Sequence, residues 1–124
     1  MIVSDTIWSE LQTPIDVTGE TTTITLQDGI SGYQINMGSV DTEINFVTTA
    51  LNQAMLANDT NAFGFDLFIS MGSTVQTIEF PENVIWLCDL PPVMNAPNKL
   101  YLIHVWSLDG GETYLATEMG SVSI

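Results

Sequence analysis

The chain has 124 residues, of which 45% are hydrophobic, and this is the size of one domain with a substantial core. Fifteen acidic residues against a single cation, Lys99, give a formal net charge of -14, which excludes binding to nucleic acid or to an anionic membrane surface. Charged residues make up only 13% of the chain and the mean hydropathy is +0.25, which indicates more apolar surface than one protomer hides, and hence an oligomer.

The first twenty residues differ in pattern from the rest. Residues 1–20 show no clean alternation of apolar and polar side chains, and they lack the basic and apolar regions of a secretory signal peptide. We expect residues 1–20 to form an N-terminal arm or anchor held by a neighbouring subunit, and residues 21–124 to form the folded domain. The longest apolar stretch, residues 62–71, is far shorter than the ~20 residues of a membrane-spanning helix, so we expect a soluble protein.

From residue 21 onward the apolar residues recur with a period of two, which is typical of half-buried strands. In the clearest segment every second residue from Phe63 to Met71 is apolar. Residues 100–106 are apolar on both faces, as in a central strand or in one whose outer face meets another subunit. The expected strands in chain order are residues 21–26, 33–37, 42–46, 63–71, 75–80, 83–87, 100–106, 113–117 and 122–124.

Turn signals separate these segments. Glycine, asparagine and aspartate, which suit chain reversals, occur at residues 28–29, 38–39, 58–61, 72–73 and 109–111. Short strands joined by such turns predict an all-β fold, and more specifically an antiparallel β-sandwich, jelly-roll-like, of about eight strands. Only residues 50–57 compete for a short helix, with Thr48 or Thr49 as its N-cap.

Residues that carry chemistry are scarce. His104 is the sole histidine and Cys88 the sole cysteine, so neither a catalytic triad nor a zinc site has its partners, and no disulfide forms within the chain. We expect His104 to be partly buried with its polar atoms satisfied, and Cys88 to be a small buried hydrophobe. A pair of close catalytic carboxylates, or calcium held at residues 58–61 or 109–112, stays open, although turns explain these acids better. The sequence therefore predicts no enzyme, no cofactor and no metal site.

Aromatic residues are the best candidates for contacts with a ligand or another subunit. In a small β-sandwich such residues are more often core or interface anchors than platforms for stacking sugars. Trp86, at a strand end beside Pro91 and Pro92, is the best ligand candidate. The full set of possible ligand or interface aromatics is Trp8, Trp86, Tyr101, Trp106 and Tyr114.

The last third of the chain has a recognisable order of segments. A strand ends in Phe80–Pro81, a short strand ends in Trp86, a proline loop leads to an apolar strand at 100–106, and an Asp-Gly-Gly turn leads to Tyr114. With the strands from residue 33 onward, this order resembles the C-terminal β-sandwich module of tailed-phage fibre, baseplate and head-fibre proteins. The chain departs from that module in residues 87–90, where Pro-Gly is common, and at Tyr114, where tryptophan is common.

The resemblance implies a non-enzymatic structural protein of the virion. It implies a homotrimer that decorates the capsid or forms part of a head fibre, tail fibre or other appendage, contacts other virion proteins, and adheres to a host glycan. The competing interpretation is a soluble carbohydrate-binding module, which would be monomeric with an exposed row of aromatic rings. A small acidic hydrolase is a third class, and it would need two close carboxylates in unequal environments.

Overall fold

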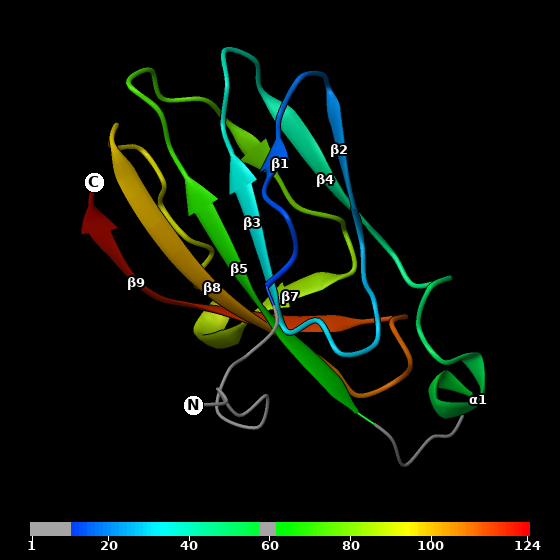
Figure 1. The fold of residues 1–124 in the computed structure, drawn as a ribbon. Helices are drawn as coiled ribbons and strands as arrows, with labels where there is room; N and C mark the ends of the chain where they lie inside the picture. The colour runs from blue at the N-terminus through cyan, green and yellow to red at the C-terminus, as the bar shows by residue number, and fades with distance from the viewer. Residues whose placement is uncertain (1–10, 58–61) are drawn as a thin grey trace, which may run out of the picture.

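The structure, a computed structural model, describes residues 11–57 and 62–124. Nearly all of the regular secondary structure in these residues is strand, so the predicted all-β class is confirmed (Figure 1). No helix in the described part of the chain is long and apolar enough to cross a membrane. The elements in chain order are β1 (Ile15–Asp16), β2 (Thr21–Thr25), β3 (Gly32–Asn36), β4 (Thr42–Val47), α1 (Gln53–Leu56), β5 (Phe63–Ser70), β6 (Ile78–Glu79), β7 (Val84–Trp86), η1 (Leu87–Asp89), β8 (Lys99–Ser107) and β9 (Tyr114–Ser123).

The strands form two sheets, with the hydrogen-bonded orders β1-β3-β5-β8-β9-β7 and β2-β4-β6. From β1 to β6, consecutive strands alternate between the two sheets. Neighbours within a sheet are therefore separated by two reversals of the chain, and they run parallel. Figure 1 shows β3, β5 and β8 side by side, with β2 and β4 together at the right of the view.

The predicted antiparallel pairing is wrong for most of the molecule. Among the described strands, only β5–β8 and β8–β9 pair antiparallel, and the remaining five pairings are parallel. The turn residues do mark reversals, but between β1 and β6 each reversal carries the chain to the other sheet instead of to a hydrogen-bonded neighbour. Because a jelly roll is built from antiparallel strands, the predicted jelly-roll-like pairing is also wrong.

One apolar core is shared by both sheets. Ile24 and Ile44 enter it from the three-stranded sheet, and the ring of Phe46 on β4 packs edge-on against Phe65 on β5, with centroids 5.3 Å apart. The alternation predicted for residues 63–71 is confirmed, because side chains at every second position of a strand point to the same face. The buried residues of that segment are Phe65, Leu67, Ile69 and Met71, and Phe63 is half-buried.

The last strand is longer than predicted. Residues 113–117 and 122–124 were expected to be two strands, but β9 runs without a break from Tyr114 to Ser123. A shift of register opposite Leu102 and Ile103, together with the positive φ of 155° at Gly120, accommodates an extra residue in β9. The strand continues through this bulge and stays paired with β8.

The predicted short helix exists, but its cap differs from the prediction. α1 covers only Gln53–Leu56, and the side chain of Asn52 accepts hydrogen bonds from the backbone N–H groups of Ala54 and Met55. Neither Thr48 nor Thr49 caps the helix, because it begins only at Gln53 and Asn52 is the residue directly before it. Asn52 therefore supplies the side-chain acceptor that starts the helix.

Residues 11–17, which belong to the expected N-terminal arm, run along the edge of the larger sheet. The N–H of Gln12 donates to the carbonyl of Gly32 at 2.9 Å, and the N–H of Val17 donates to that of Asn36 at 2.9 Å. β1 thus forms the edge next to β3. The expectation for residues 1–10 lies outside the described residues, and the division into arm and domain stays a prediction.

Candidate functional site: the outer face of the six-stranded sheet

The side of the six-stranded sheet that points away from the core carries a connected group of apolar side chains. The register places Phe68 on β5 opposite Leu102 on β8, and Leu100 opposite Val122 on β9. We call this surface the outer face, and define it by the outward residues of the four strands β5, β7, β8 and β9. These are Asp66, Phe68, Ser70, Ile85, Leu100, Leu102, His104, Trp106, Leu115, Thr117, Met119 and Val122.

Much of the outer face is open to solvent in the single chain. Ile85, Met119 and Val122 are 51%, 62% and 58% exposed. A shallow hollow of about 300 Å³ opens between Phe68, Leu102 and these β9 residues. An apolar surface that spans three neighbouring strands is more than the scattered exposed hydrophobics of an ordinary monomer, and it is typical of an interaction site.

Most charges of the chain lie elsewhere. Asp66 is the one carboxylate among the residues that define the outer face, whereas Asp16 lies on the same side of the sheet but on the edge strand β1, opposite Asn36. Glu118 of β9 stands opposite the inward Ile103. Around the three-stranded sheet, by contrast, four carboxylates line one groove of about 300 Å³. Those carboxylates belong to Glu20, Asp41, Glu43 and Glu79. The molecule therefore has one nearly neutral apolar face on a strongly acidic body.

Asp66 and His104 form the polar centre of the outer face. Nδ1 of His104 lies 2.5 Å from Oδ1 of Asp66, and the two side chains are 27% and 43% exposed. The His104 ring packs edge-on against Trp106, with centroids 4.1 Å apart. The prediction of a partly buried, satisfied histidine is confirmed.

The same pair does not extend into a nucleophile. Thr117 on β9 is the hydroxyl residue opposite His104, but no hydrogen bond joins the two side chains. Nε2 of His104 instead lies 3.6 Å from the position that a Cβ on Gly64 would take. A general base must reach the proton that it removes, and Nε2 has no such donor among the described side chains.

Trp86 lies in a separate groove. Its ring packs edge-on against Phe80, with centroids 4.9 Å apart, and both rings are half-buried. Pro91 and Pro92 form part of the lining of this groove of about 350 Å³, with Glu82 as its carboxylate. The structure thus brings Trp86 and the proline loop together, as the sequence suggested.

The other predicted aromatics occupy different surroundings. Tyr101 and Tyr114 are buried, 3% and 2% exposed, so neither ring is available to a ligand or a neighbouring chain. Burial, followed by the nearby charge of Asp109, raises the pKa of Tyr114 to about 12. Trp106 is half-buried on the outer face, and Trp8 lies outside the described residues.

The predicted burial of Cys88 is wrong. Its side chain is exposed in η1, and its φ of 59° is in the left-handed region, as is the φ of 55° at Asp89. These two residues turn the chain sharply away from the sheet after Trp86, so the thiol points away from the core.

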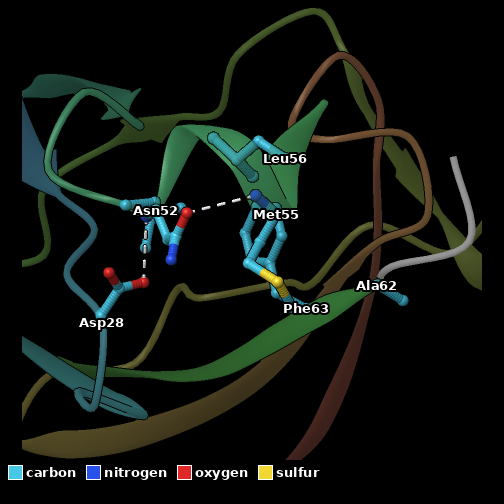
Figure 2. Close-up of a pocket in the computed structure, with 7 residues that line it drawn as sticks. Asp28, Asn52, Met55, Leu56, Ala62 and Phe63 are labelled. Atoms are coloured by element: carbon cyan, nitrogen blue, oxygen red, sulfur yellow. Dashed lines mark hydrogen bonds between the residues drawn. The ribbon is translucent and has the colours of Figure 1, made fainter. Parts of the chain in front are cut away.

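A further pocket of about 200 Å³ lies between α1 and the start of β5 (Figure 2). Oδ1 of Asp28 accepts from the backbone N–H of Asn52, and Oδ1 of Asn52 accepts in turn from Met55. Phe63 and Ala62 also line the pocket, and Figure 2 shows Phe63 next to Met55. These polar atoms hold the loop before α1, so the pocket offers few free groups to a ligand.

Comparison with protein-family models, with curated proteins and with solved structures finds no match to this chain. The outer face and the Trp86 groove are therefore the two features from which a function can be argued. The sequence predicted Trp86 and Trp106 as possible ligand or interface residues, and it predicted that the strand at 100–106 is apolar on both faces. It missed Phe68 and Val122 as parts of a surface, because only the pairing across strands brings them together.

Proposed function

We propose that the chain is a structural component of a bacteriophage virion, either a head fibre or capsid decoration protein or part of a tail appendage. It acts by assembly with copies of itself and with other virion proteins. The observation that supports this function is the apolar, nearly neutral outer face on a chain with a net charge of -14. Apolar surface of this extent costs free energy in water, and assembly removes that cost.

We further propose that the assembly is a homotrimer and that the two sheets form a β-sandwich, as in the phage module that the sequence resembles. The contact between Phe46 and Phe65 and the shared core support face-to-face packing of the two sheets. The role is non-enzymatic and needs no cofactor. Both ring nitrogens of His104 lie next to β5, Nδ1 at Asp66 and Nε2 near Gly64, and this supports a structural role for the Asp66–His104 pair.

Mass spectrometry of purified phage particles tests the proposal. We expect the chain in a fixed stoichiometry that is a multiple of its own oligomer, outside the compartment that holds the genome. Deletion of residues 1–10, which leaves β1 in place, is expected to release a folded chain from the particle. Particles that lack the chain would refute the virion role, and a deletion variant that stays bound would refute anchoring by the N-terminal residues.

A second candidate function, adhesion to a glycan, is favoured by the Trp86 groove. The face of a half-buried tryptophan can stack on the apolar side of a sugar ring, and Glu82 can accept hydrogen bonds from hydroxyl groups. Because the chain is strongly acidic, the glycan would be neutral or carry amines. Trp86→Ala is expected to abolish retention on such a glycan, whereas Ile85→Ala, on the opposite side of β7, retains it.

A further inference from the structure

We infer that the outer face is the contact surface between copies of this chain, so that its occupant in the assembled protein is a second copy. This inference rests on the proposed function, which already includes assembly of copies of the chain, and it adds which surface those copies share. It follows from the distribution of charge and apolar side chains over the two sheets.

Charge decides which surfaces of two copies can meet. Every copy carries a net charge of -14, and carboxylates that approach within about 8 Å at physiological salt repel one another with little screening. A contact between copies at the groove of Glu20, Asp41, Glu43 and Glu79 would bring four carboxylates of each copy close to a neighbour that is itself strongly acidic. The outer face has Asp66 alone, and its partner His104 already binds that carboxylate.

A second copy also matches the outer face in chemistry. In a contact between identical chains, each copy must offer a surface that suits its partner. Around the threefold axis of the proposed homotrimer the outer faces of three copies can meet one another, so that apolar side chains such as Phe68, Leu100 and Leu102 contact equally apolar ones. An anionic lipid surface would be repelled by the acidic chain, and a hollow this shallow encloses little of a small ligand.

The free edge of β9 extends this surface. β7 pairs with β9 only as far as Ala116, and no other described strand pairs with the outer edge of β9 from Thr117 to Ser123. Unpaired strand edges readily accept another chain, and this edge carries the exposed Met119 and Val122. The open backbone and the apolar side chains thus lie at the same end of the outer face.

The Asp66–His104 pair gives the contact a defined arrangement. A buried charge without a partner is costly, but these two side chains satisfy each other within one protomer. A single polar pair within an apolar contact is costly wherever the partner chain separates the two groups or covers them with apolar side chains. The pair therefore favours one register of the contact over others. We therefore assign Asp66 and His104 a positioning role in assembly.

Sedimentation equilibrium on the full chain tests this inference with two charged variants and one control. Leu102→Glu and Val122→Glu each place a carboxylate on the outer face, and each is expected to weaken self-association by about 100-fold or more. Thr23→Glu places the same group at an exposed position of β2, and it is expected to associate like the original chain. Circular dichroism confirms that each variant is folded, and Val122, already 58% exposed, tolerates substitution if Leu102→Glu does not fold.

The original chain is expected to sediment as a multiple of 13.6 kDa. A monomer at micromolar concentration would overturn the inference, and so would unchanged association of folded Val122→Glu. A chain that associates through the outer face but is missing from phage particles would refute the virion role and leave this contact standing. A particle-bound chain that is monomeric in solution and unaffected by Val122→Glu would refute the contact alone.

Discussion

The hydroxyl groups of Thr22 on β2 and Thr42 on β4 lie 2.7 Å apart, and both side chains are buried. Each hydroxyl is the buried partner of the other. We expect Thr42→Val to lower the free energy of unfolding by about 1–3 kcal/mol, because it leaves the hydroxyl of Thr22 buried without a hydrogen bond. The double variant with Thr22→Val is expected to be less destabilised than the sum of the single variants.

Urea denaturation of the four proteins of this cycle measures the coupling. Thr23→Val, at an exposed position of β2 next to Thr22, is the control and is expected to change stability by no more than about 0.5 kcal/mol. Additive effects of Thr22→Val and Thr42→Val would show that the hydrogen bond contributes nothing to stability.

The sequence predicted most of the segments that form strands, but not β1, and of the strand expected at 75–80 only Ile78–Glu79 is formed. Alternation in residues 63–71 determines an inner face wherever the strand lies, since side chains in a strand alternate between faces. The same pattern cannot say which strand is the neighbour. A turn at residues 28–29 gives the same local signal whether the chain returns within one sheet or crosses to the other, and the structure uses the crossing.

The candidate site could be predicted only in part for a related reason. The apolar residues on both faces of segment 100–106 predicted a central strand, and β8 lies between β5 and β9. The apolar face also needs Phe68 and Val122, which are far from β8 in sequence and become neighbours through pairing register. The predicted burial of Cys88 was wrong for a local reason. A left-handed turn exposes this residue, although free cysteine is usually buried.

Replacement of Asp66 is expected to affect assembly more than folding. The Asp66–His104 pair is partly exposed in the single chain, where such pairs contribute at most about 1 kcal/mol to stability. In the assembled protein, Asp66→Asn would leave His104 within the contact without its charged partner, and association is expected to weaken. Parallel urea denaturation and sedimentation measurements separate the two effects.

Glu43→Gln is the matched control for Asp66→Asn, because it also removes one carboxylate but lies at an exposed position of β4. It is expected to leave association unchanged or to strengthen it slightly as net charge falls. Equal effects of both substitutions on association would argue that total charge, and not the Asp66–His104 pair, governs assembly.

The stability of the turn between β8 and β9 is expected to fall at acid pH, because Asp109 becomes protonated there. Its carboxylate accepts a hydrogen bond from the N–H of Thr113, and this bond is the main cause that lowers the pKa of Asp109 from its usual 3.8. A lowered pKa means that the stabilisation is present above pH 3.8 and is lost as pH falls through the lower value in the folded chain.

Asp109→Asn tests this dependence. We expect the variant to be less stable than the original chain at neutral pH, and the difference to shrink at acid pH below 3.8, as Asp109 of the original chain becomes protonated. Urea denaturation of both proteins at the two pH values measures the difference, in which contributions of the other acids cancel. A difference that stays constant with pH would mean that ionisation of Asp109 does not stabilise the turn.

At alkaline pH the stability of the folded chain is expected to fall as pH rises, and the cause is Tyr114. Burial and then the charge of Asp109 raise its pKa from 10.0 to about 12, so the folded chain favours the neutral phenol. This stabilisation is fully present below pH 10.0 and is lost as pH rises to about 12. Relative to Tyr114→Phe, the original chain is therefore expected to lose stability over this range in urea denaturation. Because Tyr33 and the other tyrosines are the same in both proteins, a stability difference that does not change over this range would show that folding does not raise the pKa of Tyr114.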